Sequence, residues 1–379
     1  MKRFFIYLII FICVFLSMKL SAYSHNSFEN TENTQLGKVI NVEFVDNNIQ
    51  GSKISQLKQI VTLQILSGEF KNEIIDVENI ITGTPAYDLI TKKGDKLILH
   101  EETKDGESEF FISDIQRAPF MLVLVGLFAL LLIIVGRKKG LCSLLAIFIT
   151  CFLIVSCLTP LIVNRINPIL ATMLICIVST AITMYLVGGI NYKSTAAFLG
   201  TIVSIFFALI LSVITVYFAH ITGFSNESCT FLYSSHPEIN LQHIAISAIL
   251  LATLGAIMDI AMSISSAINE FSVINEVLSI KELFKSGMNV GKDIIGTMAN
   301  TLILVYLGGA LPLVLLSDNI DFQKFLNLNQ IVTEISAALI GSITLLICVP
   351  ITAIISATLI KMKKTTNSDI ILANKEDLL

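Results

Sequence analysis

Charged residues are scarce in this chain: Asp, Glu, Lys and Arg make up 14% of its 379 residues, against 54% hydrophobic residues. A typical soluble domain has about 25% charged residues, so this chain has too few to cover a water-exposed surface. Tryptophan is absent altogether. The composition argues against an ordinary soluble enzyme and predicts a membrane protein with several spans.

Several catalytic and nucleotide-binding motifs are also missing. The chain has no G-x-x-x-x-G-K-[ST] loop, no H-E-x-x-H and no G-x-S-x-G. These absences argue against nucleotide hydrolysis by a P-loop and against common metalloprotease and esterase designs. No basic, aromatic-bearing surface is evident, so we expect no nucleic-acid binding. We predict that the protein is not an enzyme and carries no cofactor.

The seven cysteines form no recognisable framework. Six lie in apolar runs and only Cys229 lies in a polar stretch, so neither a disulfide set nor a CxxC metal site can be drawn. His220, His236 and His243 surround one polar stretch, but their spacing matches no established metal-ligand pattern. We therefore predict no metal site.

Composition divides the chain into four regions. Residues 1–24 begin with two cations and an apolar run, the pattern of a cleaved signal peptide or a retained signal-anchor helix, and both alternatives stay open. Residues 25–117 have a soluble composition with strand-like alternation. Residues 118–362 carry long apolar runs, and residues 363–379 form a polar tail.

The alternating segments in residues 25–117 predict a small β domain. They are Val39–Phe44, Ile60–Ile65, Lys96–Leu99 and Phe110–Ile112, with turn signals at Ser67-Gly68, Gly94-Asp95 and Asp105-Gly106. About five short strands in such a length suit an OB-like barrel or a sandwich.

Seven apolar segments after Arg117 are long enough to cross roughly 30 Å of hydrocarbon as helices. They are residues 119–135, 141–163, 168–186, 196–220, 244–267, 294–316 and 331–360. The N-terminal run would make an eighth. We therefore expect a polytopic α-helical membrane protein of seven or eight spans with a small N-terminal extracytoplasmic β domain.

Lys and Arg are unevenly distributed between the two sides of these spans. With the β domain outside, the inner side carries thirteen cations: Lys2, Arg3, Arg137, Lys138, Lys139, Lys193, Lys281, Lys285, Lys292, Lys361, Lys363, Lys364 and Lys375. The short outer loops carry only Arg165 and Lys324. The positive-inside rule then predicts a plasma-membrane protein with an extracytoplasmic β domain and a cytoplasmic C-terminus.

One intramembrane carboxylate stands out in the fifth of these spans. A polar, small face is formed at spacings of three and four by Ala252, Ala256, Asp259, Ser263, Ser266 and Glu270. Ionisable groups at bilayer depth are unfavourable, and they commonly mark ion or proton pathways. The alternative is that Asp259 only joins two helices through hydrogen bonds.

The next span supplies possible partners for Asp259. Its first half carries Asp293, Gly296, Thr297, Asn300 and Thr301, and its far end has Gly308-Gly309 followed by Pro312. Thr and Asn side chains can hydrogen-bond a carboxylate, and the weakened helix end can free carbonyls to line a cavity. A kinked packing helix is the alternative.

Two further features rank lower. The apolar spacing of Val273, Val277, Ile280, Phe284 and Met288 predicts an amphipathic connector at the inner membrane surface. Glu334 lies about one turn from the outer end of the last apolar segment, where it can reach water. We rank Glu334 below Asp259 as a functional carboxylate.

These two consecutive spans resemble a known family. The run LGAIMDIAMSISSAINE at residues 254–270 and the run GKDIIGTMANTLILVYLG at residues 291–308 look like the signature of the YibE/F-like bacterial membrane proteins. The layout of an exported β domain before several spans is similar too, from about Gly37 to Ile360. The resemblance implies a multipass membrane protein, often supposed to be a permease, but no substrate. It draws attention to Asp259, Asn269, Glu270, Asp293, Asn300 and Thr301.

Together these observations predict a permease or ion-coupled transporter that uses an intramembrane carboxylate. The predicted ion- or substrate-binding residues are Asp259, Ser263, Glu270, Asp293, Thr297, Asn300 and Thr301. The expected partners are the lipid bilayer and a small solute or ion, and the small-residue faces would permit a homo-oligomer. The alternative is a non-transporting membrane scaffold whose outer β domain binds an envelope partner.

Overall fold

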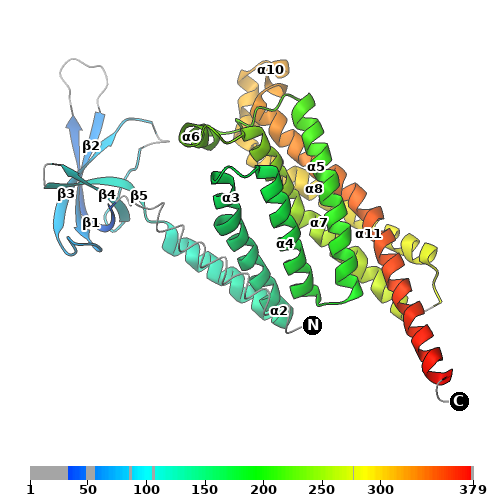
Figure 1. Ribbon diagram of the computed structural model, residues 1–379. Coiled ribbons are helices and arrows are strands. Elements are labelled where there is room, and N and C mark those ends of the chain that lie inside the picture. The colour runs from blue at the N-terminus through cyan, green and yellow to red at the C-terminus, as the bar shows by residue number, and fades with distance from the viewer. Residues whose placement is uncertain (1–32, 48–55, 85–87, 105–106, 276, 377–379) are drawn as a thin grey trace. The chain divides into compact units, whose positions relative to one another are not determined.

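The computed structural model describes residues 33–47, 56–84, 88–104, 107–275 and 277–376 (Figure 1). The chain forms two compact units, and the boundary between them along the sequence falls between Leu131 and Leu132. One unit contains the strands and the other contains most of the helices. The predicted signal or anchor at residues 1–24 and the predicted turn at Asp105-Gly106 lie outside the described residues.

The β unit is a single antiparallel sheet in the order β3-β2-β1-β4-β5. Its strands are β1 Asn33–Asn47, β2 Gln56–Ile65, β3 Ile74–Ile81, β4 Lys96–Lys104 and β5 Glu107–Ile115. The long β1 pairs with both β2 and β4 and is bulged between Val39 and Asn41. Because β3 also approaches β5, the described sheet curls into a near-barrel. This topology matches the predicted OB-like barrel.

Alternation along the strands builds the core of this sheet. Val61, Leu63 and Ile65 point inward from β2 and are fully buried, as are Leu97 and Leu99 from β4. All four predicted alternating segments lie within strands. The segment that sequence reasoning missed is β3, where Asp76, Glu78 and Asn79 interrupt the apolar pattern.

The helix α2, Ala118–Leu153, contains a reversal of the chain. Arg137 has φ 48° and ψ −126°, which no helical residue adopts. A Cβ added to Gly140 would collide with the carbonyl oxygen of Leu132, eight residues earlier, so the two segments fold back on each other. Helix α2 is therefore interrupted at Arg137, in agreement with the two spans predicted on either side of this residue.

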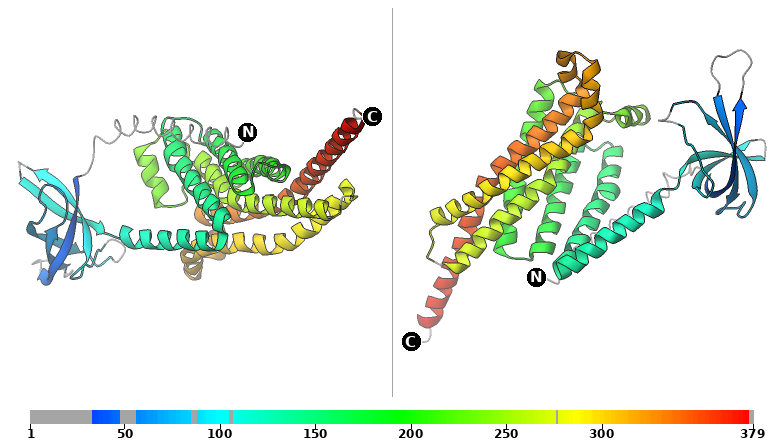
Figure 2. Two further views of the ribbon diagram at one scale, coloured as in Figure 1. Left: turned by 90° about the horizontal axis from the view of Figure 1, so that it is seen from below. Right: turned by 180° about the vertical axis from the view of Figure 1, so that it is seen from behind.

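The remaining helices follow in chain order. They are the π-helical turn η1 Ile154–Leu158, α3 Thr159–Val163, α4 Pro168–Gly188, α5 Tyr192–Phe218, α6 Glu227–Ser235, α7 Leu241–Ile274, α8 Ile280–Gly309, α9 Leu311–Leu315, the 3-10 turn η2 Leu316–Asn319, α10 Phe322–Leu326 and α11 Asn329–Glu376. Four long helices, α5, α7, α8 and α11, pack side by side, and α4 packs against α5 and α7 (Figures 1 and 2).

Polar caps fix where the long helices begin. The side chain of Asn167 accepts a hydrogen bond from the Ile169 amide before α4, and that of Asn240 accepts from the Gln242 amide before α7. Ser279 and Glu282 form a reciprocal capping box at the start of α8. These caps replace hydrogen bonds that the first turn of a helix lacks.

Small residues let the long helices approach closely. A Cβ on Gly200 of α5 would collide with Thr352 of α11, and a Cβ on Gly291 of α8 would collide with Val349 of α11. Close approach through glycine is the usual way in which membrane helices associate, since lipid supplies no hydrophobic driving force between them. The core of this unit is formed around α7, where Leu250, Ile257 and Ile264 are among the fully buried side chains.

The predicted surface connector is corrected by the structure. Residues 280–291 form the first half of the continuous helix α8, and Leu283 and Gly287 are buried against α7 and α11. The amphipathic pattern therefore reflects helix packing rather than a separate interfacial helix. At the other end, α8 stops at Gly309, short of the predicted span end at residue 316, and the chain breaks at the glycine pair before α9.

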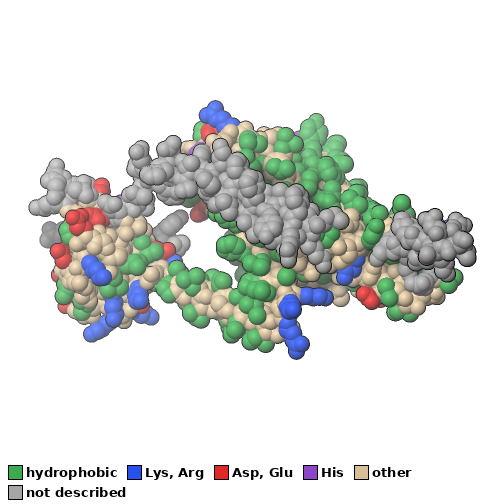
Figure 3. Space-filling view, turned by 60° about the horizontal axis from the view of Figure 1, so that its bottom comes forward, with side chains coloured by type: hydrophobic (Ala, Val, Ile, Leu, Met, Phe, Trp, Pro, Cys, Tyr) green, Lys and Arg blue, Asp and Glu red, His purple; other side chains and the backbone are tan. Residues whose placement is uncertain are grey.

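Six described helices are long and apolar enough to cross a membrane. The first of them, Ala118–Val163, includes the reversal at Arg137 and so supplies two of the seven predicted spans. Hydrophobic side chains cover much of the visible face of the helical unit, with charged side chains mostly toward its ends (Figure 3). The chain is a membrane protein with a small N-terminal β domain.

Candidate functional site: a carboxylate in an interhelical cavity

Asp259 lies on the open face of α7. On the opposite face of this helix, the side chains of Ile257, Ile260 and Ile264 are buried. Asp259 and Ser263 are exposed. A Cβ added to the nearby Gly255 would meet no atom within 4 Å. The small, polar face predicted from spacing exists, but among the described residues it is open rather than packed against the next span.

A cavity of about 360 Å³ lies beside Asp259. Its walls come from the second half of α2, from α4 and from α7, and its lining includes Ser143, Thr150, Thr183 and Met262 in addition to Asp259. All these residues belong to the helical unit. Among the described residues, Asp259 makes no hydrogen bond or ion pair, so its carboxylate faces the cavity without a partner.

Hydrogen bonds at two points hold the walls of the cavity together. The hydroxyls of Thr150 on α2 and Ser179 on α4 are 2.8 Å apart. Ser265 on α7 donates to the carbonyl of Lys193 at the start of α5, at 2.7 Å. The first bond fixes the second half of α2 against α4, and the second fixes α7 near the end of α4.

The candidate residues of α8 do not line this cavity. Asp293, Thr297, Asn300 and Thr301 are exposed on the surface of α8. The Thr301 hydroxyl donates to the carbonyl of Thr297 within the same helix, at 2.9 Å. In the described residues, no hydrogen bond joins Asp259 to Asn300 or Thr301.

Asp259 and the polar part of α8 nevertheless lie at a similar depth. Gly287 of α8 packs against Ile268 of α7, and the two helices are antiparallel. Counted from this contact at 1.5 Å per residue, Asp259 is level with Gly296. The two open polar faces therefore lie at the same level along the helix axes, in one layer of the helical unit.

Glu270 and Asn269 lie away from this layer. Both are close to the end of α7 at Ile274, and Glu270 is exposed. Eleven residues of helix separate Glu270 from Asp259, about 16 Å along the axis. Of the predicted α7 residues, Asp259 lines the cavity and Ser263 lies one turn away from it on the same face.

Sequence reasoning missed the contributions of α2 and α4 to this site. Ser143, Ala146 and Thr150 recur at spacings of three and four and line the cavity together, with Thr183 facing them from α4. That spacing was present in the sequence. It lacked a charged residue, so nothing distinguished it from an ordinary packing face.

Comparison with known families agrees with this organisation. The family model described as YibE/F-like protein matches residues 124–362, and that of the YibE/F family N-terminal domain matches residues 28–115. The chain belongs to the YibE/F-like family. Neither a curated protein nor a solved structure matches it.

The cavity of this YibE/F-like protein supplies only oxygen and sulfur atoms as polar groups. Carboxylate and hydroxyl oxygens suit hard cations, and a lone carboxylate can also carry a proton. No group of three or more His, Cys, Asp or Glu side chains gathers anywhere in the described part of the chain. The arrangement is thus suited to one proton or one weakly held cation rather than to a tightly bound transition metal.

Proposed function

We propose that this YibE/F-like protein is a permease or ion-coupled transporter in which Asp259 binds the coupling proton or cation. The observation that carries the proposal is an unpaired carboxylate facing a cavity between three helices of a membrane protein. An ionisable group in a bilayer is retained mainly where it meets water, an ion or a partner. The same cavity supplies hydroxyl groups beside it.

We further propose that the protein lies in a bacterial plasma membrane with its β domain outside and its C-terminus in the cytoplasm. The arrangement of the cations supports this orientation. The Lys361 ammonium donates to the carbonyl of Leu278 in the α7–α8 connection, at 3.0 Å, and Lys193 lies beside Ser265 near the same end of α7. Two cations, Lys193 of α5 and Lys361 of α11, thus lie near the same end of α7, which supports this orientation.

Flux through purified protein in liposomes tests the transport proposal. Protons, alkali and divalent cations and small anions would be screened, with Asp259→Asn beside the parent and Asp318→Asn as the control. Asp318 is exposed in η2, outside the candidate spans. We expect flux in the parent and the control, and none in Asp259→Asn. Full flux in both Asp259→Asn and Asp259→Ala would reject the role of Asp259.

Labelling of Cys229 tests the orientation. This partly buried thiol follows α5, at the end of the helical unit opposite Lys193. In a variant that keeps Cys229 as its one cysteine, a membrane-impermeant maleimide should react from the outside of intact cells. Reaction only after cell lysis would reverse the proposed topology.

The scaffold alternative has one observation in its favour. A shallow hollow beside β3 and β5 is lined by Phe70, Phe110 and Phe111 together with acidic residues that include Glu73 and Asp76. Such a surface suits a partner with basic and apolar groups. Absence of flux for a folded protein, with function retained by a membrane-tethered β domain, would favour this alternative.

A further inference from the structure

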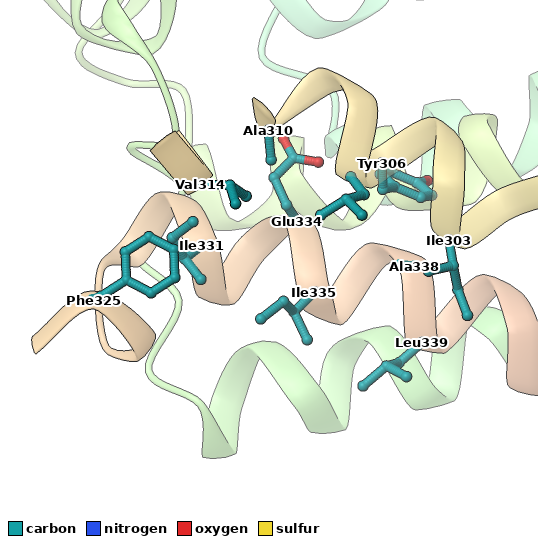
Figure 4. Close-up of a pocket in the computed structure, with 11 residues that line it drawn as sticks. Ile303, Tyr306, Ala310, Val314, Phe325, Ile331, Glu334, Ile335, Ala338 and Leu339 are labelled. Atoms are coloured by element: carbon teal, nitrogen blue, oxygen red, sulfur yellow. The ribbon is translucent and has the colours of Figure 1, made fainter. Parts of the chain in front are cut away.

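A second cavity in the helical unit, of about 270 Å³, surrounds Glu334 (Figure 4). It lies between the end of α8, α9, α10 and the start of α11. Nine of its eleven lining residues are aliphatic or phenylalanine, and the other two are Glu334 and Tyr306. The site is therefore an apolar cavity with one carboxylate and one phenol ring.

Glu334 lacks a counter-charge in this cavity. It extends from the second turn of α11 toward Ala310, between α8 and the turn that follows it (Figure 4). The residue is half-buried, and it makes no hydrogen bond or ion pair with any described residue. A carboxylate that merely reached for the membrane surface would point to water, whereas this one faces apolar walls. Such a group is unfavourable unless a cation pairs with it.

Tyr306 contributes an aromatic ring to the wall of the cavity. Its ring lines the cavity, while its hydroxyl points away from Glu334 (Figure 4) and is buried with no hydrogen-bond partner among the described residues. An aromatic ring attracts a cation placed over its face. A carboxylate and an aromatic ring on the walls of one apolar cavity are the groups that recognise an organic ammonium.

We propose that this cavity binds a small organic cation, with its apolar body against Phe325, Ile331 and Leu339 and its ammonium beside Glu334. The volume lies just below the roughly 300 Å³ at which pockets for drug-sized ligands begin, so the ligand is small. A bare metal ion would find one carboxylate and no further ligands. An anion would be repelled, and an uncharged apolar molecule would leave Glu334 unpaired. This site is distinct from the Asp259 cavity and does not depend on the proposed transport function.

Binding of phenethylammonium to the full-length protein tests the proposal. The protein would be held in nanodiscs of phosphatidylglycerol, which carries no ammonium group, and binding would be followed by calorimetry. We expect saturable binding of phenethylammonium and none of 2-phenylethanol, which has the same apolar body without the charge. Equal binding of the two compounds would overturn the proposal.

Variants locate the site. Glu334→Gln keeps the size of the side chain and should weaken binding roughly tenfold or more, because the neutral amide removes the negative charge that pairs with the ammonium. Glu334→Asp should restore part of the affinity. Tyr306→Phe keeps the ring and should bind as the parent does, while Tyr306→Leu should bind more weakly. Asp318→Asn, which alters an exposed acid outside the cavity, is the control.

Unchanged binding in Glu334→Gln would reject the placement of the ammonium beside Glu334, provided that thermal unfolding shows the variant to be folded. A last binding measurement adds phosphatidylethanolamine to the nanodiscs, because its headgroup also carries an ammonium group. Competition with phenethylammonium would identify a lipid headgroup as the natural source of the cation. Lack of competition would identify a free amine, and both outcomes leave the cation assignment intact.

Discussion

Two carboxylates in the helical unit, Asp259 and Glu334, lie in cavities of different character. The Asp259 cavity is formed by three helices and has serine and threonine side chains in its walls. The Glu334 cavity forms where α8 ends and short helical turns follow, and its walls are almost wholly apolar. The surroundings of the two carboxylates therefore favour different occupants, an inorganic ion or proton at Asp259 and an organic cation at Glu334.

The difference shows that a carboxylate within apolar sequence is not by itself a specific signal. Both residues are single acids in long hydrophobic segments, and sequence position ranks Asp259 higher only because it is farther from a segment end. What separates their chemistry is the set of residues that other helices bring beside them. Ser143 and Thr150 come from α2, whereas Ile303 and Tyr306 come from α8.

The largest expected effect is that substitutions of the two carboxylates impair different properties of the protein. Asp259→Asn should reduce ion flux to background while leaving phenethylammonium binding intact. Glu334→Gln should weaken amine binding while leaving flux at the parent level. Flux and calorimetry on the same preparations measure both properties. Loss of both properties in each single variant would show that the two cavities act as one site.

Filling each cavity separately is the next test. Val187→Phe places a ring in the Asp259 cavity, and Leu307→Phe places one in the Glu334 cavity. Each should impair only its own property, because a misfit of about 1–3 kcal/mol corresponds to a loss of roughly fivefold to more than a hundredfold. Flux and amine binding are again the measurements. A decrease in flux for Leu307→Phe would contradict the separation.

Glycine substitutions compare the packed and open parts of the helical unit. Gly291→Ala should destabilise the protein by about 1–3 kcal/mol, because the new methyl group collides with Val349. Gly255→Ala is the matched control on the open face near Asp259, and it should be neutral or stabilising by up to about 1 kcal/mol. Thermal unfolding in detergent measures both. Equal destabilisation would mean that another surface covers the face around Gly255.

The smallest expected effect concerns the wall of the Asp259 cavity. Thr150→Val removes the hydroxyl that lies 2.8 Å from that of Ser179, and it should lower stability by about 0.6 kcal/mol, the average for such bonds in membranes. Thr215→Val removes a hydroxyl bonded only within α5 and serves as the control. A larger loss of flux for Thr150→Val than for the control would indicate that this bond also positions the α2 wall.

Much of the fold follows from periodicity. Alternation such as Val61, Leu63 and Ile65 predicts a half-buried strand, and long apolar runs predict spans. The reversal at Arg137 was also predictable, because Arg137, Lys138 and Lys139 interrupt an apolar run. The connector ahead of Ile294 was interpreted wrongly, since the same spacing of Ile280, Phe284 and Met288 suits a helix that packs on protein and one that lies on a membrane.

The candidate sites were predictable only in part. Asp259 and Ser263 share a face because 3.6 residues complete a turn, and the sequence determines that spacing. The expected contact with Asn300 and Thr301 is a relation between two helices, and spacing within each helix contains no information on it. The α2 and α4 walls of the cavity could not be predicted either, because their position beside α7 is also a relation between helices.

The sequence by itself determined the membrane class, the order of the β and helical regions and the positions of the two acids within apolar segments, because hydrophobic length and periodicity are local properties of a chain. Tertiary structure alone decided which helices pack, which face of α7 stays open and which residues surround Asp259 and Glu334. The reason is that helices in lipid are matched by close fit at positions such as Gly200 with Thr352 and Gly291 with Val349, and such a fit exists only once both surfaces are in place.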